Sequence, residues 1–460
     1  MQQKGYSVNE EALKIIEECE SWYKNEEIDD FHRRKNLNDK EIRLSRMNFA
    51  KRCCADDANL CEIIGVSPDE KSSATDFIDG LLKSNRFNVQ YRKQLEKVSA
   101  TGTVGAYLTL KDATYLKNPD GSTAIKGGKL KIVYVDADCI IPLTVDNDEV
   151  LECAFCATNT VKGKEQTTLV IFVYEDGRYK AETVVFNNTG AIINDVSGEL
   201  QLGEQKPFSI MTNAEVNNLE NMVGYGLPKV YNSIPLFKAV DLCFNLLYGD
   251  LGKGDKLLFI NELLACIKVG ENGEPKLTAQ QKDLFVLLGD KLPQQDSIIK
   301  EYNPEIRVET ITKAFELVLS LLSMSFGYGT KKYSFENGQI KTATEYIGER
   351  QDAMQELNKQ RKNATDYITD IIRAAMWFSN QFSNTTYNLN EELMIEFDDS
   401  FIEDKVSMLE SMRADAVTFQ DIPWLTYTYI KTKYNLSDDE AEKYIKEGKM
   451  REEPTNDLED

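Results

Sequence analysis

The chain has 460 residues, a formal net charge of −22 at pH 7, and a 42% share of hydrophobic residues. These numbers are typical of a soluble globular protein with about two to four domains. No apolar run reaches the roughly 18–20 residues of a membrane span, and the N-terminus lacks the pattern of a secretion signal. The net negative charge argues against a protein that binds nucleic acid tightly over a broad basic surface. It does not argue against a protein that surrounds DNA without binding it tightly.

Cysteine and histidine usage restricts the available chemistry. His32 is the only histidine, so Ser-His-Asp triads and histidine metal sites are nearly excluded. Cys153 and Cys156 form a C-x-x-C pair, but they sit in a strand-like run without a second pair at metal-binding spacing. We expect the nine cysteines to be reduced, structural thiols in a reducing compartment.

The first part of the chain is predicted to be helical and the next part β-rich. Apolar spacing predicts helices at residues 7–31, 38 to about 64, 73–85 and 91–99. A strand is expected at 106–110. Residues 130–210 alternate or run apolar between Asp, Asn and Gly turns, which is typical of an antiparallel meander.

Two amphipathic helices are predicted on either side of a compact segment, residues 256–306. The first begins at Ser233, has Pro235 in its first turn and runs to about Leu251. The second covers Arg307–Ser325. It has a polar stripe and an apolar stripe. The polar stripe contains Glu309, Thr312, Lys313, Glu316, Ser320 and Ser323, and the apolar stripe contains Ile311, Phe315, Val318, Leu319 and Leu322.

The segment from Gly327 to Ser383 combines a loop with a long helix. The loop carries Lys331, Lys332 and Lys341, and Thr342-Ala-Thr-Glu345 has the pattern of a capping box. A helix of about 40 residues should follow, roughly 60 Å long. Its pattern is compatible with a bundle helix or with a spine in a large assembly.

After this helix, a short strand is predicted at 393–397. Helices are predicted at 400–416, 419–434 and 438–447, followed by an acidic, disordered end from Arg451.

Signatures of catalysis are lacking. The run Gly249–Lys256 has the wrong residues and the wrong place for a phosphate loop, and Asp136-Ala-Asp138 is interpreted as a solvated strand face. We expect no catalytic residues, no metal and no cofactor, so the chain is predicted not to be an enzyme.

This order of elements resembles the portal (head–tail connector) proteins of tailed bacteriophages, of the type common in siphophages of Gram-positive hosts. The resemblance covers nearly the whole chain. Its most specific pieces are IPLFKAVDLCFNLLYGDL (Ile234–Leu251), GQIKTATEY (Gly338–Tyr346) and FDDSFIEDKVSML (Phe397–Leu409). All three are packing and capping patterns, so the resemblance depends on their order and spacing.

The resemblance implies an α+β protomer that assembles as a ring, usually a dodecamer, at one capsid vertex. It divides the chain into N-terminal helices with a β-rich wing (1–232), stem helix 1 (233–255), a small α/β clip (256–306), stem helix 2 (307–326), a tunnel loop (327–342), a long helix with a wing return (343–399), helical crown (400–450) and an acidic disordered tail (451–460).

It also implies a function, partners and a location. Double-stranded DNA would be packaged through the ring by the terminase motor, retained and later ejected. Lys331, Lys332 and Lys341 would meet DNA in the channel, and Glu309, Lys313 and Glu316 would face the channel from the stem. The implied partners are further copies of the chain, the terminase large subunit, head–tail adaptor proteins and a major capsid or scaffolding protein, with no membrane. The implied location is the virion, and the host cytoplasm during assembly.

Other interpretations stay open on the sequence alone. The loop lysines are equally compatible with a solvated loop. The chain is also compatible with a cytosolic α+β enzyme whose active site is not recognised, or with another virion structural protein such as a capsid or adaptor subunit.

Overall fold

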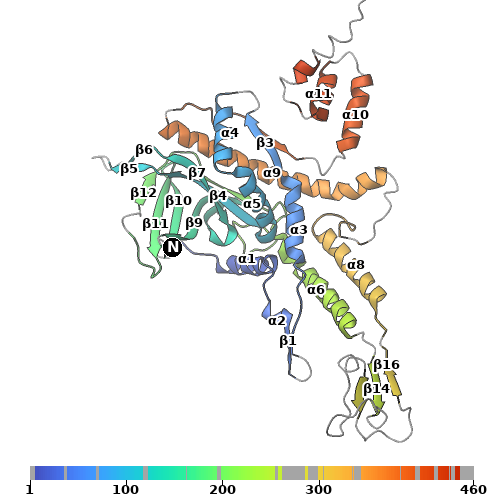
Figure 1. Ribbon diagram of the computed structural model, residues 1–460. Helices are drawn as coiled ribbons and strands as arrows, with labels where there is room; N and C mark the ends of the chain where they lie inside the picture. The colour runs from blue at the N-terminus through green and yellow to red at the C-terminus, as the bar shows by residue number, and fades with distance from the viewer. Residues whose placement is uncertain are drawn as a thin grey trace, which may run out of the picture. The chain divides into compact units, whose positions relative to one another are not determined.

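The computed structural model contains both helices and sheets (Figure 1), which confirms the α+β class. The structure describes residues 6–35, 39–68, 72–117, 123–161, 163–193, 198–253, 257–261, 285–288, 299–303, 305–333, 335, 343–383, 385–398, 405–418, 423–434, 436 and 441–445. The chain divides into two compact units, residues 1–61 with 66–395, and residues 62–65 with 396–460.

Five helices precede the large sheets of the first unit. They are α1 (Glu10–Tyr23), α2 (Asp29–His32), α3 (Phe49–Ala58), α4 (Ala74–Ser84) and α5 (Phe87–Thr101). The side chain of Asn9 caps α1 by accepting a hydrogen bond of 3.1 Å from the Ala12 N–H. Most predicted helices of this part are confirmed with shifted ends.

The predicted helix from 38 to 64 is wrong over most of its length. Strand β2 (Glu41–Arg43) lies there and pairs antiparallel with β1 (Arg33–Lys35), and only α3 and the 3-10 turn Asn59–Cys61 are helical. The reason is local, because Asp39 and Asn48 have φ angles of +56° and +55°, which lie outside the helical region. The structure also has a strand, β3 (Ile63–Pro68), where the helix was expected to end.

The β-rich region forms two antiparallel sheets. One has the order β13-β4-β7, from β4 (Thr103–Lys111), β7 (Lys129–Asp136) and β13 (Phe208–Thr212). The other has the order β12-β11-β10-β9-β8 and is the predicted meander. Its strands are β8 (Ile140–Asp146), β9 (Glu149–Val161), β10 (Lys164–Glu175), β11 (Arg178–Asn187) and β12 (Gly198–Gln201). A separate hairpin joins β5 (Thr114–Lys117) and β6 (Thr123–Lys126).

An aromatic cluster packs these two sheets against each other. Tyr107 of β4 stacks on Phe155 of β9, with ring centroids 5.1 Å apart, and Phe172 and Phe208 complete the cluster. Gly105 lies opposite this cluster, where a Cβ atom would stand 3.2 Å from the Phe155 ring. Aromatic side chains at alternate strand positions therefore form the core between the sheets.

Helix α6 (Lys229–Lys253) starts four residues earlier than predicted. Ser233 is therefore not its cap, and Pro235 lies inside the helix. Pro228, directly before the first helical residue, marks the start instead, since proline tolerates the first turn of a helix. A three-stranded sheet follows, with the order β15-β14-β16, from β14 (Leu257–Asn261), β15 (Phe285–Leu288) and β16 (Ile299–Tyr302). Helix α8 (Val308–Ser325) comes next.

The long helix α9 (Ala343–Phe382) has 40 residues, which confirms the prediction of its length. It packs on β13 and β4 (Figure 1), and its Tyr367 hydroxyl hydrogen-bonds to the buried Gln94 of α5. Gln94 in turn donates a hydrogen bond of 2.9 Å to the Gly105 carbonyl. The predicted cap Thr342 and its neighbours in 336–342 lie outside the described residues.

The C-terminal elements begin with β17 (Leu393–Phe397), at its predicted position, which pairs with β3. In the second unit, α10 (Lys405–Thr418) and α11 (Pro423–Tyr434) follow, and the predicted helix starts at 400 and 419 lie outside the described residues. The predicted acidic tail and most of the predicted helix 438–447 lie outside the described residues.

Two further observations concern membrane spans and thiols. Within the described part of the chain, no helix has the length and apolarity to cross a bilayer. The described cysteines are free thiols, and most are buried. Burial raises the pKa of the Cys54 thiol well above its usual value. Cys153 is buried and Cys156 is half-buried on β9, and their odd spacing turns them to opposite faces of the strand.

We expect replacement of Gly102 to be more costly than replacement of a turn glycine with the same backbone conformation. Gly102 has φ +80° and a Cβ there would meet the Gly226 carbonyl oxygen at 2.2 Å, whereas Gly177 has φ +77° and open space. G102A should lower the free energy of unfolding by about 2–5 kcal/mol, from strain and overpacking. G177A should lose only about 1–2 kcal/mol. Equal losses in denaturant unfolding would contradict this account.

Candidate functional site

Helices α6 and α8 form an antiparallel pair, which we call the stalk (residues 229–253 and 308–325). Two contacts hold its opposite ends. The hydroxyl oxygens of Ser233 and Ser325 lie 2.8 Å apart at one end. At the other end, Arg307 donates to both carboxylate oxygens of Asp250, at 2.9 and 2.8 Å. The chain therefore leaves the stalk at Asp250 and returns to it at Arg307, and the side chains of these two residues are in contact.

Helix α8 has three different faces. Ile311, Phe315, Leu319 and Leu322 are buried against the rest of the chain. Glu309 and Lys313 are exposed and Glu316 is half-buried, so the three predicted stem residues share one side of the helix. Ser323 departs from the predicted polar stripe, because it is buried and its hydroxyl accepts a hydrogen bond of 3.2 Å from the Lys332 N–H.

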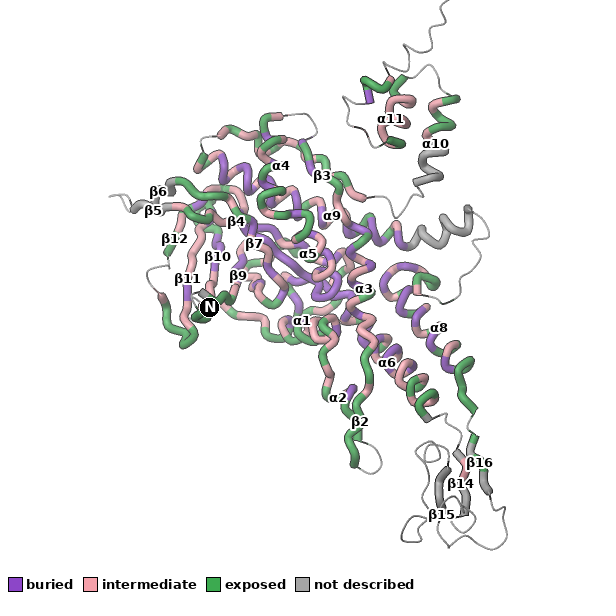
Figure 2. Tube along the Cα trace, viewed as in Figure 1, coloured by how far each residue is buried: buried purple, intermediate pink, exposed green. Residues whose placement is uncertain are grey.

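The third face of α8 is apolar and exposed. Leu317, Leu321 and Met324 are 62%, 40% and 56% exposed. Their i, i+4, i+7 spacing places them on one side of the helix, roughly opposite the buried side. We call these three residues the α8 stripe. Near the end of α6, Leu246, Tyr248 and Leu251 are also more than half exposed (Figure 2).

The sequence prediction missed the α8 stripe. A helical projection of residues 308–325 contains two apolar arcs on opposite sides, and this is the signal that identifies it. Only the arc that became buried was recognised as significant. A helix that is apolar on two opposite sides is expected to pack against other protein surfaces on both of these sides.

The loop after α8 starts with buried residues and then becomes exposed. Gly327 has φ +80°, and Tyr328 is 5% exposed. Lys331 and Lys332 are exposed, and the Lys332 ammonium lies 5.7 Å from the centre of the Tyr328 ring. Lys341 lies outside the described residues. Glu309 is at the opposite end of α8, roughly 20 Å from the loop, so the structure does not bring the loop lysines and Glu309 together.

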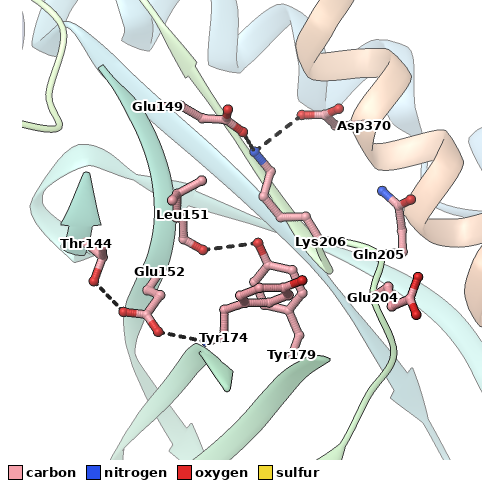
Figure 3. A pocket seen from close by; sticks show the side chains of 10 residues that line it. All are labelled: Thr144, Glu149, Leu151, Glu152, Tyr174, Tyr179, Glu204, Gln205, Lys206 and Asp370. Carbon is pink, nitrogen blue, oxygen red and sulfur yellow. Dashed lines mark hydrogen bonds and ion pairs between the residues drawn. The ribbon is translucent and has the colours of Figure 1, made fainter. Parts of the chain in front are cut away.

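A surface hollow of about 590 Å³ lies beside the five-stranded sheet (Figure 3). Lys206 points into it, with its Nζ 2.7 Å from Glu149 Oε1 and 3.8 Å from Asp370 Oδ2. The hollow is lined by Thr144, Glu149, Leu151, Glu152, Tyr174, Tyr179, Glu204, Gln205, Lys206 and Asp370. No sequence motif marked this site, because its residues come from four separate segments.

The polar groups in this hollow largely satisfy each other. Tyr179 donates a hydrogen bond of 3.2 Å to the Leu151 carbonyl, and burial raises its pKa to about 12, so the hydroxyl stays protonated at neutral pH. Glu152 accepts from the Tyr174 N–H at 2.7 Å and from the Thr144 hydroxyl. Lys206 of the same chain occupies the position of a cation between Glu149 and Asp370.

No described group of three or more His, Cys, Asp or Glu side chains is arranged to hold a metal ion. His32 is buried instead of lining a cleft. Its Nδ1 accepts a hydrogen bond of 2.9 Å from the Ile28 N–H, and its Nε2 lies 3.1 Å from Asp241 Oδ2 of α6. The histidine thus attaches the N-terminal segment to the stalk.

Comparison with models of known protein families found no match, and comparison with curated protein sequences found no significantly similar protein. The functional proposal therefore depends on the geometry of the stalk and of the loop that follows it.

We expect the contacts of Lys206 with Glu149 and Asp370 to stabilise the fold by an amount that depends on pH. K206M should lower the free energy of unfolding at pH 7 by about 0.5–1 kcal/mol, a modest value because Glu149 is 62% exposed. Burial raises the pKa of Asp370 and Lys206 opposes this rise. The loss should therefore shrink as the pH falls through the raised pKa of Asp370, where the carboxyl binds a proton. Denaturant unfolding at several pH values tests this, and a loss independent of pH would contradict it.

Proposed function

We propose that this chain is the subunit of a ring that conducts double-stranded DNA, of the portal (head–tail connector) type. The observation that carries the proposal is the α8 stripe. Its three exposed apolar side chains share one side of one helix, and a repeated interface between copies would cover them.

A ring is favoured over a closed dimer because the exposed apolar residues occupy two different surfaces. One surface is the α8 stripe, and the other is the end of α6, where Tyr248 and Leu251 share one side of the helix and are exposed. Contact between unlike surfaces is heterologous, and a heterologous contact closes into a ring when its rotation allows.

The order of elements supports the same proposal. The stalk corresponds to the two stem helices, and the sheet β15-β14-β16 between them corresponds to the clip. The loop with Lys331 and Lys332 corresponds to the tunnel loop, and helix α9 follows it. In this proposal the clip contacts the terminase motor and head–tail adaptors, and the ring meets capsid or scaffolding protein at one vertex.

The charge of the chain suits a channel through which DNA slides. Acidic residues outnumber basic ones by 76 to 54, so a surface made of many copies repels a polyanion overall. Lys331 and Lys332 are exposed in the loop after α8, and in a ring they repeat once per copy. Brief contacts with phosphate at this level can retain DNA without stopping its movement.

We expect the purified chain to form closed rings of identical copies with a central hole, seen by native mass and negative-stain images. L317S with L321S should dissociate the rings into monomers while the circular dichroism stays unchanged, because both side chains are exposed in the single chain. V216S is the control, since Val216 is 88% exposed outside the stalk. A monomer or a holeless dimer of the natural chain at tens of micromolar would contradict the proposal.

We also expect the loop lysines to act on DNA and not on assembly. Replacing Lys331, Lys332 and Lys341 with Ala should leave ring formation intact and reduce the DNA retained per head in infected cells. The matched control replaces Lys111, Lys129 and Lys131, which are exposed on β4 and β7. Unchanged DNA content in the loop variant would remove the DNA-contact role.

A further inference from the structure

One lysine of the stalk has a side chain that is both buried and positively charged. The Lys229 side chain, at the start of α6, is 1% exposed. Its Nζ lies 2.8 Å from Asp57 Oδ1 and 2.9 Å from Glu356 Oε1, whose side chains are 10% and 8% exposed. The Tyr328 hydroxyl donates a hydrogen bond of 3.0 Å to the same Asp57 oxygen. We call Lys229, Asp57, Glu356 and Tyr328 the buried network.

The four residues of the buried network come from four different segments. Asp57 belongs to α3, Lys229 to the stalk, Tyr328 to the loop after α8, and Glu356 to α9. Gly327 also packs on α9, since a Cβ atom there would lie 3.1 Å from Glu356 Cγ. The network thus fixes the start of the loop to three helices, three residues before Lys331.

Electrostatics make Lys229 the centre of this network. Burial acts to lower the pKa of Lys229, but Asp57 and Glu356 outweigh burial and raise it. Burial acts to raise the pKa of Glu356, but Lys229 and Lys359 together outweigh burial and lower it. Without the lysine charge, two buried carboxylates would face each other across a small space, which is strongly unfavourable.

Other charged groups surround the network. Glu215, from the loop before α6, has a pKa that burial raises, and it feels the fields of Lys229, Glu356 and Asp57. Lys359 of α9 lies 3.2 Å from the second oxygen of Glu356, and Arg361 and Cys61 lie near enough to interact electrostatically with the network. Lys229 pairs with both Asp57 and Glu356, so its removal takes away the cation that these two carboxylates share.

We propose that Lys229 is a positioning residue that holds the start of the loop, residues 327–333, against α9 and thereby sets where Lys331 and Lys332 are presented. The part about DNA depends on the function proposed above, whereas the part about the loop does not. Packing alone would hold only the ring of Tyr328. Its hydroxyl also donates a hydrogen bond to Asp57, which pairs with Lys229, so the position of Tyr328 depends on the charge of Lys229 as well.

Hydrogen exchange of the purified chain tests this directly. The amides of Gly327, Tyr328 and Lys332 donate hydrogen bonds to Met324 O, Ser323 O and Ser323 Oγ, so their exchange reports on the loop. K229M should speed exchange at these amides by at least about tenfold relative to the sheet core. Y328F, which keeps the ring and removes one hydroxyl, should give a smaller increase and covers the case in which K229M does not fold.

Two further variants separate positioning from general stability. K206M breaks a lysine–carboxylate pair far from the loop in sequence and should leave loop exchange unchanged. K229M combined with D57N and E356Q removes the buried charges together, so the thermal midpoint should return toward that of the natural chain. Loop exchange should nevertheless stay fast. Slow loop exchange in the triple variant, or unchanged exchange in both K229M and Y328F, would overturn the proposal.

A separate measurement connects the network to DNA. Heads assembled with the triple variant should retain less DNA, which is also the expected result for heads with the three loop lysines replaced. If loop exchange is fast and retention is normal, the role of the loop in DNA retention is wrong while the positioning role of Lys229 stands.

Discussion

The buried positive charge of Lys229 is the constraint on which the packing of the surrounding helices depends. The Lys229 ammonium cannot leave water unless carboxylates meet it, and the carboxylates come from α3 and α9, nearly 300 residues apart in the chain. The same point fixes the start of α6 and the root of the loop after α8. The stalk, the long helix and the N-terminal helices are therefore oriented by one network, while the two sheets are held by aromatic packing.

Local sequence patterns predicted the elements well where one periodicity dominated. The long helix α9, the strand β17 and the meander β8–β12 were found because apolar spacing was regular over many residues. The prediction for region 38–64 failed because its apolar residues are spaced as in a helix, although Glu41–Arg43 form a strand and only residues 49–61 are helical. The start of α6 failed because Ser233 and Pro235 match a helix start, although Pro228 supplies the real one.

The candidate site was predictable only in part. The positions of Glu309, Lys313 and Glu316 on one side of α8 follow from helical spacing, and so does the α8 stripe once both apolar arcs are considered. The buried network and the hollow at Lys206 could not be predicted, because each is assembled from segments that sequence spacing does not relate. Contacts across such distances are fixed by tertiary packing and not by local preference.

The ion pair between Arg307 and Asp250 has a consequence for how this protein can vary. The segment between Asp250 and Arg307 begins and ends at one bidentate ion pair. This ion pair joins the two helices of the stalk directly, without contacts from β14, β15 or β16. A segment with adjacent ends can be lengthened, shortened or exchanged at little cost to the helices that carry it. The sheet β15-β14-β16 can thus change in sequence and length while the Arg307–Asp250 ion pair still holds the two helices together.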